Sequence, residues 1–258
     1  MKLTTVCAVM IAGAVLILGI SIAKAVPITF SGTSGPHSAS ATFDKSGTNL
    51  LVTLANTSAS DVQVPTDVLT AVFFELAGNP SLTRVSAILT PGSLVFFGPT
   101  DPDIANGVGG EWAYQRGLAI DPNVGTQGFS SVGLGLFGPQ DLFPGSDLQS
   151  PASPDGLQYG ITSPVDDPNT GNTPVTGTNA LIKSSVDFVL GGLPSSFDPN
   201  TDISGVYFQY GTDLGDLRFP GDRPPDYGNP PVPEPLTLVA VGAGLAGLAR
   251  YTRRRLAR

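Results

Sequence analysis

The chain has 258 residues and a formal net charge of −8, with 21 acidic and 13 basic residues, one cysteine and one histidine. One cysteine excludes a disulfide-based scaffold, because no pair can form within the chain. One histidine and one cysteine also leave too few ligands for the usual zinc or copper sites. The acidic balance disfavours binding to nucleic acid, whose phosphates the chain repels.

The N-terminus has the three parts of a secretory signal peptide. Lys2 supplies a positive charge, residues 6–20 form an apolar stretch, and Ala23-Lys24-Ala25 fits an Ala-x-Ala cleavage site. We expect residues 1–25 to pass through a Sec translocon and to be removed by signal peptidase after Ala25. The alternative is an N-terminal membrane helix that is not cleaved.

The C-terminus carries a second targeting signal, spanning residues 232–258. It begins with the motif Val232, Pro233, Glu234 and Pro235 and continues with an apolar run over residues 236–249. Fourteen helical residues span roughly 21 Å, which is short of the roughly 30 Å of a bilayer core. A span of this marginal length is more typical of a segment that an enzyme recognises and cuts than of a permanent membrane anchor.

A basic tail over residues 250–258 follows the apolar run. Positive charge beside a membrane span keeps that side cytoplasmic, so everything before the run is expected outside the inner membrane. The orienting residues are Arg250, Arg253, Arg254, Arg255 and Arg258.

The order of motif, short helix and arginine tail resembles the sorting signal of the PEP-CTERM family of exported bacterial proteins. The resemblance covers about a tenth of the chain and rests on residues 232–258. It implies processing near Pro233-Glu234-Pro235 by an exosortase-type membrane enzyme. It also implies a transient single-pass precursor, then delivery to the cell surface or to an extracellular matrix in which exopolysaccharide is a possible partner.

Setting both targeting segments aside makes the exported body more acidic. Residues 26–235 contain all 21 acidic residues but six basic ones, which gives a net charge of −15. This surface repels anionic lipid headgroups and nucleic acid and attracts cations. The single cysteine, Cys7, lies in the signal peptide, so the mature body depends on a hydrophobic core.

Alternating apolar and polar residues predict an all-β body. In residues 39–43, 50–54, 186–190 and 206–210 every second side chain is apolar, which is the period of a strand. Further strands are expected at residues 69–76, 83–89, 94–97, 112–120 and 131–137. With no helical stripe between residues 26 and 230, we expect a single β-sandwich or jelly-roll-like domain over residues 26–218.

Two segments rich in proline and polar residues are predicted to lack regular structure. Residues 138–179 contain seven prolines among Gly, Ser, Asp, Asn and Thr, which indicates a long functional loop or a flexible insertion. Residues 219–231 form a proline-rich linker that would hold the body away from the membrane.

Aspartates concentrate in loop-like sequence and are the only predicted metal ligands. Carboxylate oxygens on loops suit calcium, although none of the clusters has the spacing of an EF-hand loop and Asp is also an ordinary turn residue. We expect no cofactor apart from calcium at these positions. The candidate ligands are Asp101, Asp103, Asp166, Asp167, Asp198 and Asp202.

Two enzymatic alternatives remain open from the sequence. Glu75 or Glu111 with an aspartate partner would form the carboxyl pair of a glycoside hydrolase, with Trp112 and Tyr114 as a sugar-stacking platform. His37 would fit a Ser-His-Asp triad, or it is an exposed turn histidine.

The expected function is that of an exported, non-catalytic surface or extracellular-matrix protein. The alternative is a carbohydrate-active enzyme or a lectin-like module on the same sorting tail.

Overall fold

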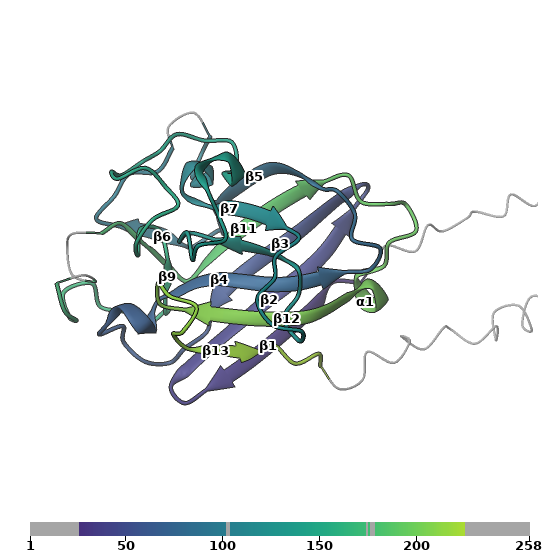
Figure 1. Cartoon of the computed structure of the whole chain (residues 1–258). Coiled ribbons are helices and arrows are strands. Elements are labelled where there is room, and N and C mark those ends of the chain that lie inside the picture. Colours follow the sequence, from purple (N-terminus) through teal and green to yellow (C-terminus); the bar gives the residue numbers. More distant parts are fainter. Residues whose placement is uncertain (1–25, 102–103, 174, 176–178, 225–258) are drawn as a thin grey trace, which may run out of the picture.

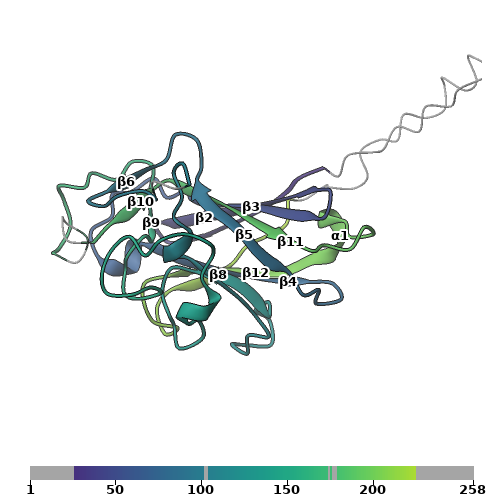
Figure 2. The same cartoon turned by 90° about the horizontal axis from the view of Figure 1, so that it is seen from above.

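The computed structural model describes residues 26–101, 104–173, 175 and 179–224. In these residues the chain is mainly β-strand and forms two sheets that pack face to face (Figures 1 and 2). The all-β, sandwich-like prediction is confirmed. Within the same residues, no helix is both long and apolar enough to cross a bilayer. The predicted signal peptide, the sorting motif and the span at 236–249 lie outside the described residues.

The first sheet has five strands in the order β1-β2-β3-β11-β5. β1 to β3 form consecutive antiparallel hairpins, and β11 adds to β3 from far along the chain. The bounds are β1 Ile28–Ser34, β2 His37–Ser46, β3 Asn49–Asn56, β11 Ser185–Gly191 and β5 Thr83–Leu89.

The second sheet has eight strands, with the path β13-β12-β4-β9-β10-β6 and the pair β7-β8 attached to β4. Its pairings are antiparallel except for β9 with β10, which run parallel. The bounds are β13 Arg218–Pro220, β12 Ile203–Tyr210, β4 Leu69–Leu76, β9 Ile161–Thr162, β10 Leu181–Lys183, β6 Leu94–Phe96, β7 Ala113–Arg116 and β8 Gln127–Ser130. The short helices are η1 Pro65–Asp67, η2 Gly109–Glu111, η3 Pro139–Asp141 and α1 Pro199–Asp202.

Strand β4 is apolar along nearly its whole length because both of its faces are covered. Val72 and Phe74 point into the space between the sheets, whereas Ala71 and Phe73 point outward. The outward face is covered by a second apolar cluster that includes Leu118, Val124 and Phe137. Loops therefore form a partial third layer outside the eight-stranded sheet.

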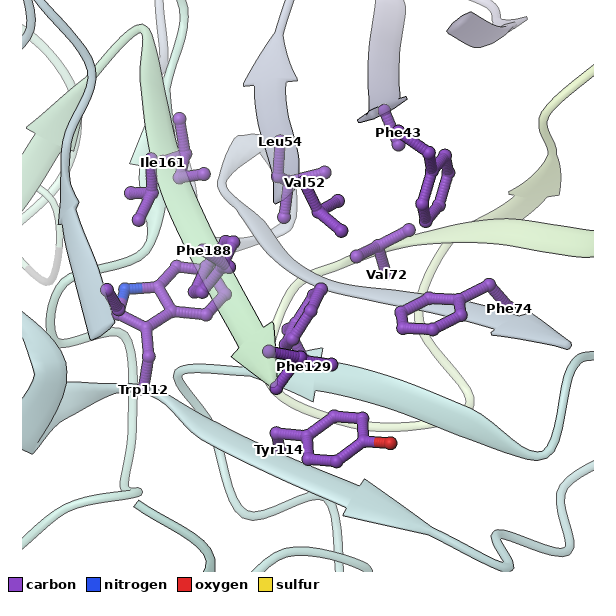
Figure 3. Packing of buried hydrophobic residues seen from close by; sticks show 14 of the residues in the cluster. Phe43, Val52, Leu54, Val72, Phe74, Trp112, Tyr114, Phe129, Ile161 and Phe188 are labelled. Atoms are coloured by element: carbon purple, nitrogen blue, oxygen red, sulfur yellow. The ribbon is translucent and has the colours of Figure 1, made fainter. Parts of the chain in front are cut away.

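Aromatic side chains join the two sheets at the centre of the sandwich (Figure 3). Phe129 of β8 and Phe188 of β11 stack with ring centroids 4.3 Å apart and an interplanar angle of 6°. Trp112 meets Phe188 edge-on at 5.1 Å, and Phe74 packs on Phe129 at 5.3 Å. Phe43 of β2 then packs edge-on against Phe74, so the ring contacts run across both sheets.

A C-terminal strap closes one open side of the sandwich. β13 pairs with β12 in one sheet, and Asp222 then exchanges backbone hydrogen bonds of 3.1 and 2.8 Å with Ser31 of β1 in the other. Gly32 lies under this strap, where a Cβ would come within 2.2 Å of the Pro220 carbonyl oxygen. A glycine is required there because any side chain would push the strap away.

The alternating segments of the sequence match β2, β3, β11 and β12, and their apolar residues are buried as expected. Residues 69–76, 83–89 and 94–97 are also close to observed strands. The prediction for residues 112–120 was too long, because β7 ends at Arg116. Residues 131–137 are not a strand: Leu134 and Gly135 adopt positive φ values of 51° and 69°, and the chain turns there.

The segment 138–179 is mostly loop, as expected, but it also contributes to the sheet and to the core. Its strand β9 lies between β4 and β10. Phe143, Tyr159 and Ile161 belong to the main core cluster and are at most 2% exposed. The described part of this segment is therefore packed against the sandwich.

The aromatic contact between the sheets predicts a large effect of Phe188→Ala. Removing a buried phenylalanine leaves a cavity, so the free energy of unfolding should fall by about 3–5 kcal/mol. Chemical denaturation of the isolated body would measure it. Val165→Ala, at a side chain that is 55% exposed, is the control and should change stability by less than about 0.5 kcal/mol.

Candidate functional site at the loop-covered pole

The sandwich has two unlike ends. At one end lies α1, and at the other lie β6, β9 and β10 with most of the long loops (Figures 1 and 2). We call the second end the loop pole. Two groups of acidic side chains are built into it, one around Glu111 and one around Asp166.

Glu111 is a buried carboxylate that organises a loop. It ends η2 and is 0% exposed. Its Oε1 accepts the backbone N–H groups of Leu148 at 2.5 Å and Gln149 at 3.2 Å, and its Oε2 accepts the hydroxyl of Ser153. Burial raises the pKa of the Glu111 carboxyl, and these hydrogen bonds oppose the rise. All of its described partners are groups of the loop itself.

The surroundings of Glu111 include further acidic and aromatic groups. Burial, together with the charge of Asp147, raises the pKa of Asp155. One side-chain oxygen of Asp155 is buried with no hydrogen-bond partner among the described residues. The Tyr159 hydroxyl donates to the Pro99 carbonyl at 2.9 Å, and its pKa is raised by burial first and then by the charges of Glu111 and Asp147. These contacts tie several loops together.

The predicted sugar platform is not at the surface. Trp112 is 0% exposed, its indole N–H donates to the Tyr159 carbonyl at 3.2 Å, and its ring packs in the core. Tyr114 is 2% exposed and donates to Gln127 Oε1 at 2.6 Å. Both rings are packed in the hydrophobic core, so neither exposes a face on which a sugar could stack.

The other candidate acid, Glu75, also holds a loop. Its Oε2 accepts both the backbone N–H of Thr126 at 2.9 Å and the Thr126 hydroxyl at 2.6 Å. Glu75 lies on β4 and Glu111 on η2, and no described contact joins their carboxyl groups. The described hydrogen-bond partners of both glutamates are N–H and hydroxyl groups, and none is the aspartate partner that the sequence analysis considered for either of them.

His37 is more enclosed than an exposed turn histidine. It begins β2, its side chain is 15% exposed, and its Nε2 lies 2.9 Å from Asp67 Oδ1. Its ring meets Tyr210 edge-on at 4.9 Å. Nδ1 is buried and has no hydrogen-bond partner among the described residues. The ring thus contacts an aspartate but no serine, and the triad geometry is not formed there.

The predicted calcium ligands lie in three separate places. Asp101 is 2% exposed and accepts the Ser146 N–H at 2.9 Å, while Asp103 lies outside the described residues. Asp166 and Asp167 lie at the loop pole. Asp198 and Asp202 lie at α1, where Asp198 caps the helix by accepting the Asn200 N–H and Asp202 accepts the Asp198 N–H, both at 2.9 Å.

Most of these carboxylates accept backbone N–H groups in their own turns, which is the ordinary structural use of Asp. Within the parts of the chain that the structure describes, no group of three or more His, Cys, Asp or Glu side chains is arranged to hold a metal ion. Calcium binding stays a prediction.

Basic side chains follow a similar pattern. Lys45 donates to carbonyls of residues 194, 195 and 197, and Arg84 donates to the carbonyls of Tyr114 at 3.2 Å and Gln140 at 3.0 Å. Arg223 likewise bonds the carbonyls of Asn200 and Ile203. The few Lys and Arg side chains thus donate hydrogen bonds to backbone carbonyls, while the many carboxylates accept hydrogen bonds from loop N–H groups.

A shallow groove of about 440 Å³ lies beside the start of β5. It is lined by Leu82, Thr83, Arg84 and residues 142–145, and its one charged group is the guanidinium that already binds two carbonyls. No carboxylate or histidine lines it. This lining offers no general acid or base for hydrolysis.

Comparison of the chain with models of known protein families, with curated proteins and with solved structures finds no match.

The hydrogen bonds of Glu111 predict that Glu111→Ala lowers the free energy of unfolding by about 3 kcal/mol or more, because two partly buried N–H groups and the buried Ser153 hydroxyl lose their acceptor. Glu111→Gln is the matched control and should cost far less, since the amide still accepts and donates. Denaturant titration of both variants separates the two cases.

The raised pKa of Glu111 adds a pH test. The folded protein retains this proton at pH values where the unfolded chain has released it, so stability should fall as pH rises through that range. The slope should be smaller in Glu111→Gln. Equal slopes in the two proteins would contradict the assignment.

Proposed function

We propose that this protein is an exported, non-catalytic surface or extracellular-matrix protein that is sorted and processed through its C-terminal signal. The signal peptide at residues 1–25 directs export, and residues 232–258 direct sorting by an exosortase-type enzyme. After processing, the acidic β-sandwich remains at the cell surface or in a matrix, with exopolysaccharide as the class of partner that this location offers.

One observation carries this proposal: the two ends of the folded body meet at α1. The carbonyl of Val26 accepts a hydrogen bond of 3.0 Å from the Asn200 side chain, and the carbonyl of Asn200 accepts one from the Arg223 guanidinium. Val26 is the expected first residue after signal cleavage, and Arg223 lies in the first part of the expected linker. The residues next to the expected signal peptide and the first part of the expected linker thus lie at the same end of the sandwich, which supports the proposal.

Arg223 fixes the point where the chain leaves the body. Its Nη2 donates to the Ile203 carbonyl at 2.8 Å, and its guanidinium lies over the Phe30 ring at 5.3 Å. The strap that contains Asp222 is held to β1 immediately before it. A tail that begins at this point would exit from a sandwich whose open side is already closed by the strap. A body tethered through such a tail would present its loop pole away from the membrane.

The placement of the candidate catalytic groups supports a non-catalytic body. Glu111, Glu75 and Trp112 each serve loop or core packing, and the groove beside β5 has no acid–base pair. We therefore prefer display or matrix integration over sugar cleavage.

Substituting the motif tests the sorting step. In a host with an exosortase-type enzyme, Glu234→Ala with Pro235→Ala should leave full-length precursor in the membrane fraction, because the enzyme no longer recognises its site. C-terminal mass spectrometry of the membrane and surface fractions would measure this. Pro230→Ala with Pro231→Ala is the matched control in the adjacent linker and should be processed normally.

Surface display and processing of the motif variant at the wild-type level would refute the sorting assignment. Recovery of wild-type surface protein with an intact residue 258 would refute cleavage and indicate a retained anchor.

A further inference from the structure

Segment 57–68 connects β3 of the first sheet to β4 of the second, and we call it the clasp segment. Val62 and Val68 of this segment are 3% and 0% exposed. They pack with Leu157, Val175 and Leu181 in a small apolar cluster that is separate from the main core. The clasp segment is therefore the cover of a satellite core.

Polar contacts to residues 163–173 hold the clasp segment in place. The Ser163 hydroxyl donates to the Ser60 carbonyl at 2.7 Å, and the Asn172 N–H donates to the Gln63 carbonyl at 2.9 Å. Asp61 Oδ1 accepts the Asp167 N–H at 2.9 Å. The two loops thus meet along several hydrogen bonds.

Two carboxyl groups meet at the centre of this contact. The backbone N–H of Val62 donates to Asp61 Oδ1 and to Asp166 Oδ1, both at 3.1 Å, which places the two carboxyl groups side by side. Asp166 is 5% exposed, and its Oδ1 shares the Val62 N–H with Asp61 Oδ1. Two adjacent carboxyl groups, one of them buried, do not both ionise without a large electrostatic cost.

The charged neighbours do not neutralise this pair. Lys183 donates to the backbone carbonyl of Asp166 at 3.0 Å and lies over the Phe96 ring, so it binds neither carboxyl group. Asp167 adds another negative charge, although its side chain bonds Asn169. His37 pairs with Asp67 at the far end of the clasp segment. The described partners of the two carboxyl groups are N–H and hydroxyl groups and each other.

We propose that a proton shared by Asp61 and Asp166 fastens the clasp segment, so that acid holds it closed over the satellite core and loss of the proton loosens it. This inference does not depend on the proposed function, because it concerns a loop contact within the body.

The direction of the effect follows from the two aspartates. Burial first, and the bond to Asp61 second, raise the pKa of Asp166 to about 6, whereas the Thr170 hydroxyl lowers the pKa of Asp61. In an opened clasp segment Asp166 would return to an ordinary pKa near about 4. The closed form therefore holds the proton between about pH 4 and about pH 6, and its advantage declines as pH rises through that window.

Opening would change the surface of the loop pole. Val64 and Val165 are already 39% and 55% exposed beside the two loops. Release of Val62 and Val68 would join these side chains to the satellite core and create a larger apolar surface. The pole would thus be closed in acid and more apolar at neutral pH.

Hydrogen exchange of the exported body tests the inference. In the wild type, the protection factor of the Val62 amide should fall about fortyfold between about pH 4 and about pH 6.5, the ratio that pKa values of about 6 and about 4 give. Asp166→Asn should abolish this fall, because a carboxamide replaces the protonated acid: its oxygen still accepts the Val62 N–H and its NH₂ donates to Asp61.

Asp155→Asn is the control, since Asp155 also has a raised pKa but lies outside the clasp segment. It should retain the wild-type dependence on pH. The Phe188 amide reports global unfolding, and its protection should exceed that of the Val62 amide at every pH, because Val62 exchanges through the local opening. A pH-independent Val62 amide in the wild type, an unchanged fall in Asp166→Asn, or Val62 protection equal to that of Phe188 would each overturn the proposal.

Discussion

The stacked contact between Phe129 and Phe188 is the interaction on which the rest of the sandwich depends. It joins β8 of one sheet to β11 of the other at a centroid distance of 4.3 Å. Trp112, Phe74 and Phe143 surround this pair, so the loops that carry Trp112 and Phe143 are held by the same cluster. Because the chain has a single cysteine and no disulfide can form within it, the sheets are held together by apolar contacts such as this one, without a covalent link.

The many acidic side chains of the body stabilise its loops by accepting hydrogen bonds from backbone N–H groups. Acidic side chains outnumber basic ones by far, and long loops present many backbone N–H groups that need acceptors. Glu75, Glu111 and Asp216 each accept two or more hydrogen bonds from such loops. The acidic character predicted from the sequence to repel nucleic acid is therefore also a means of ordering polar loops. Asp61 and Asp166 accept loop N–H groups in the same way, but their carboxyl groups lie side by side, and we propose that a proton is held between them.

The geometry of the ends separates two roles within one small domain. Asn200 contacts Val26 at the beginning of the described chain and Arg223 near its end, so both ends of the described body lie at α1. The loop pole is free of them and carries the buried carboxylates, the satellite core and the exposed Phe97 and Val165. This arrangement supports our proposal that the body is displayed at the end of a tether. The buried positions of Trp112 and Glu111 fit that role better than sugar chemistry, since neither group faces a cleft.

Local periodicity made several strands predictable. β2, β3, β11 and β12 alternate because one face meets the core and the other does not, and this pattern is visible in the residues themselves. β8 and β9 could not be found in this way. The sequence Gln127–Ser130 has no apolar alternation and becomes a strand because β4 and β7 lie on either side of it. Residues 131–137 show the opposite error: they alternate glycine with apolar residues, but glycine permits the turn that Leu134 and Gly135 adopt.

The features of the candidate site likewise fall into those that local sequence predicts and those that depend on tertiary contacts. The sequence alone determined the all-β class, the acidic and cysteine-free composition of the body, and the motifs on which the targeting proposal rests, because each is a property of nearby residues. Only the tertiary structure decided that Trp112 and Glu111 are buried, that Asp166 meets Asp61 from another loop, and that Asn200 joins the two ends of the body. These contacts link residues that are distant along the chain. No local pattern encodes them, and they form only when the two sheets close on their shared aromatic core.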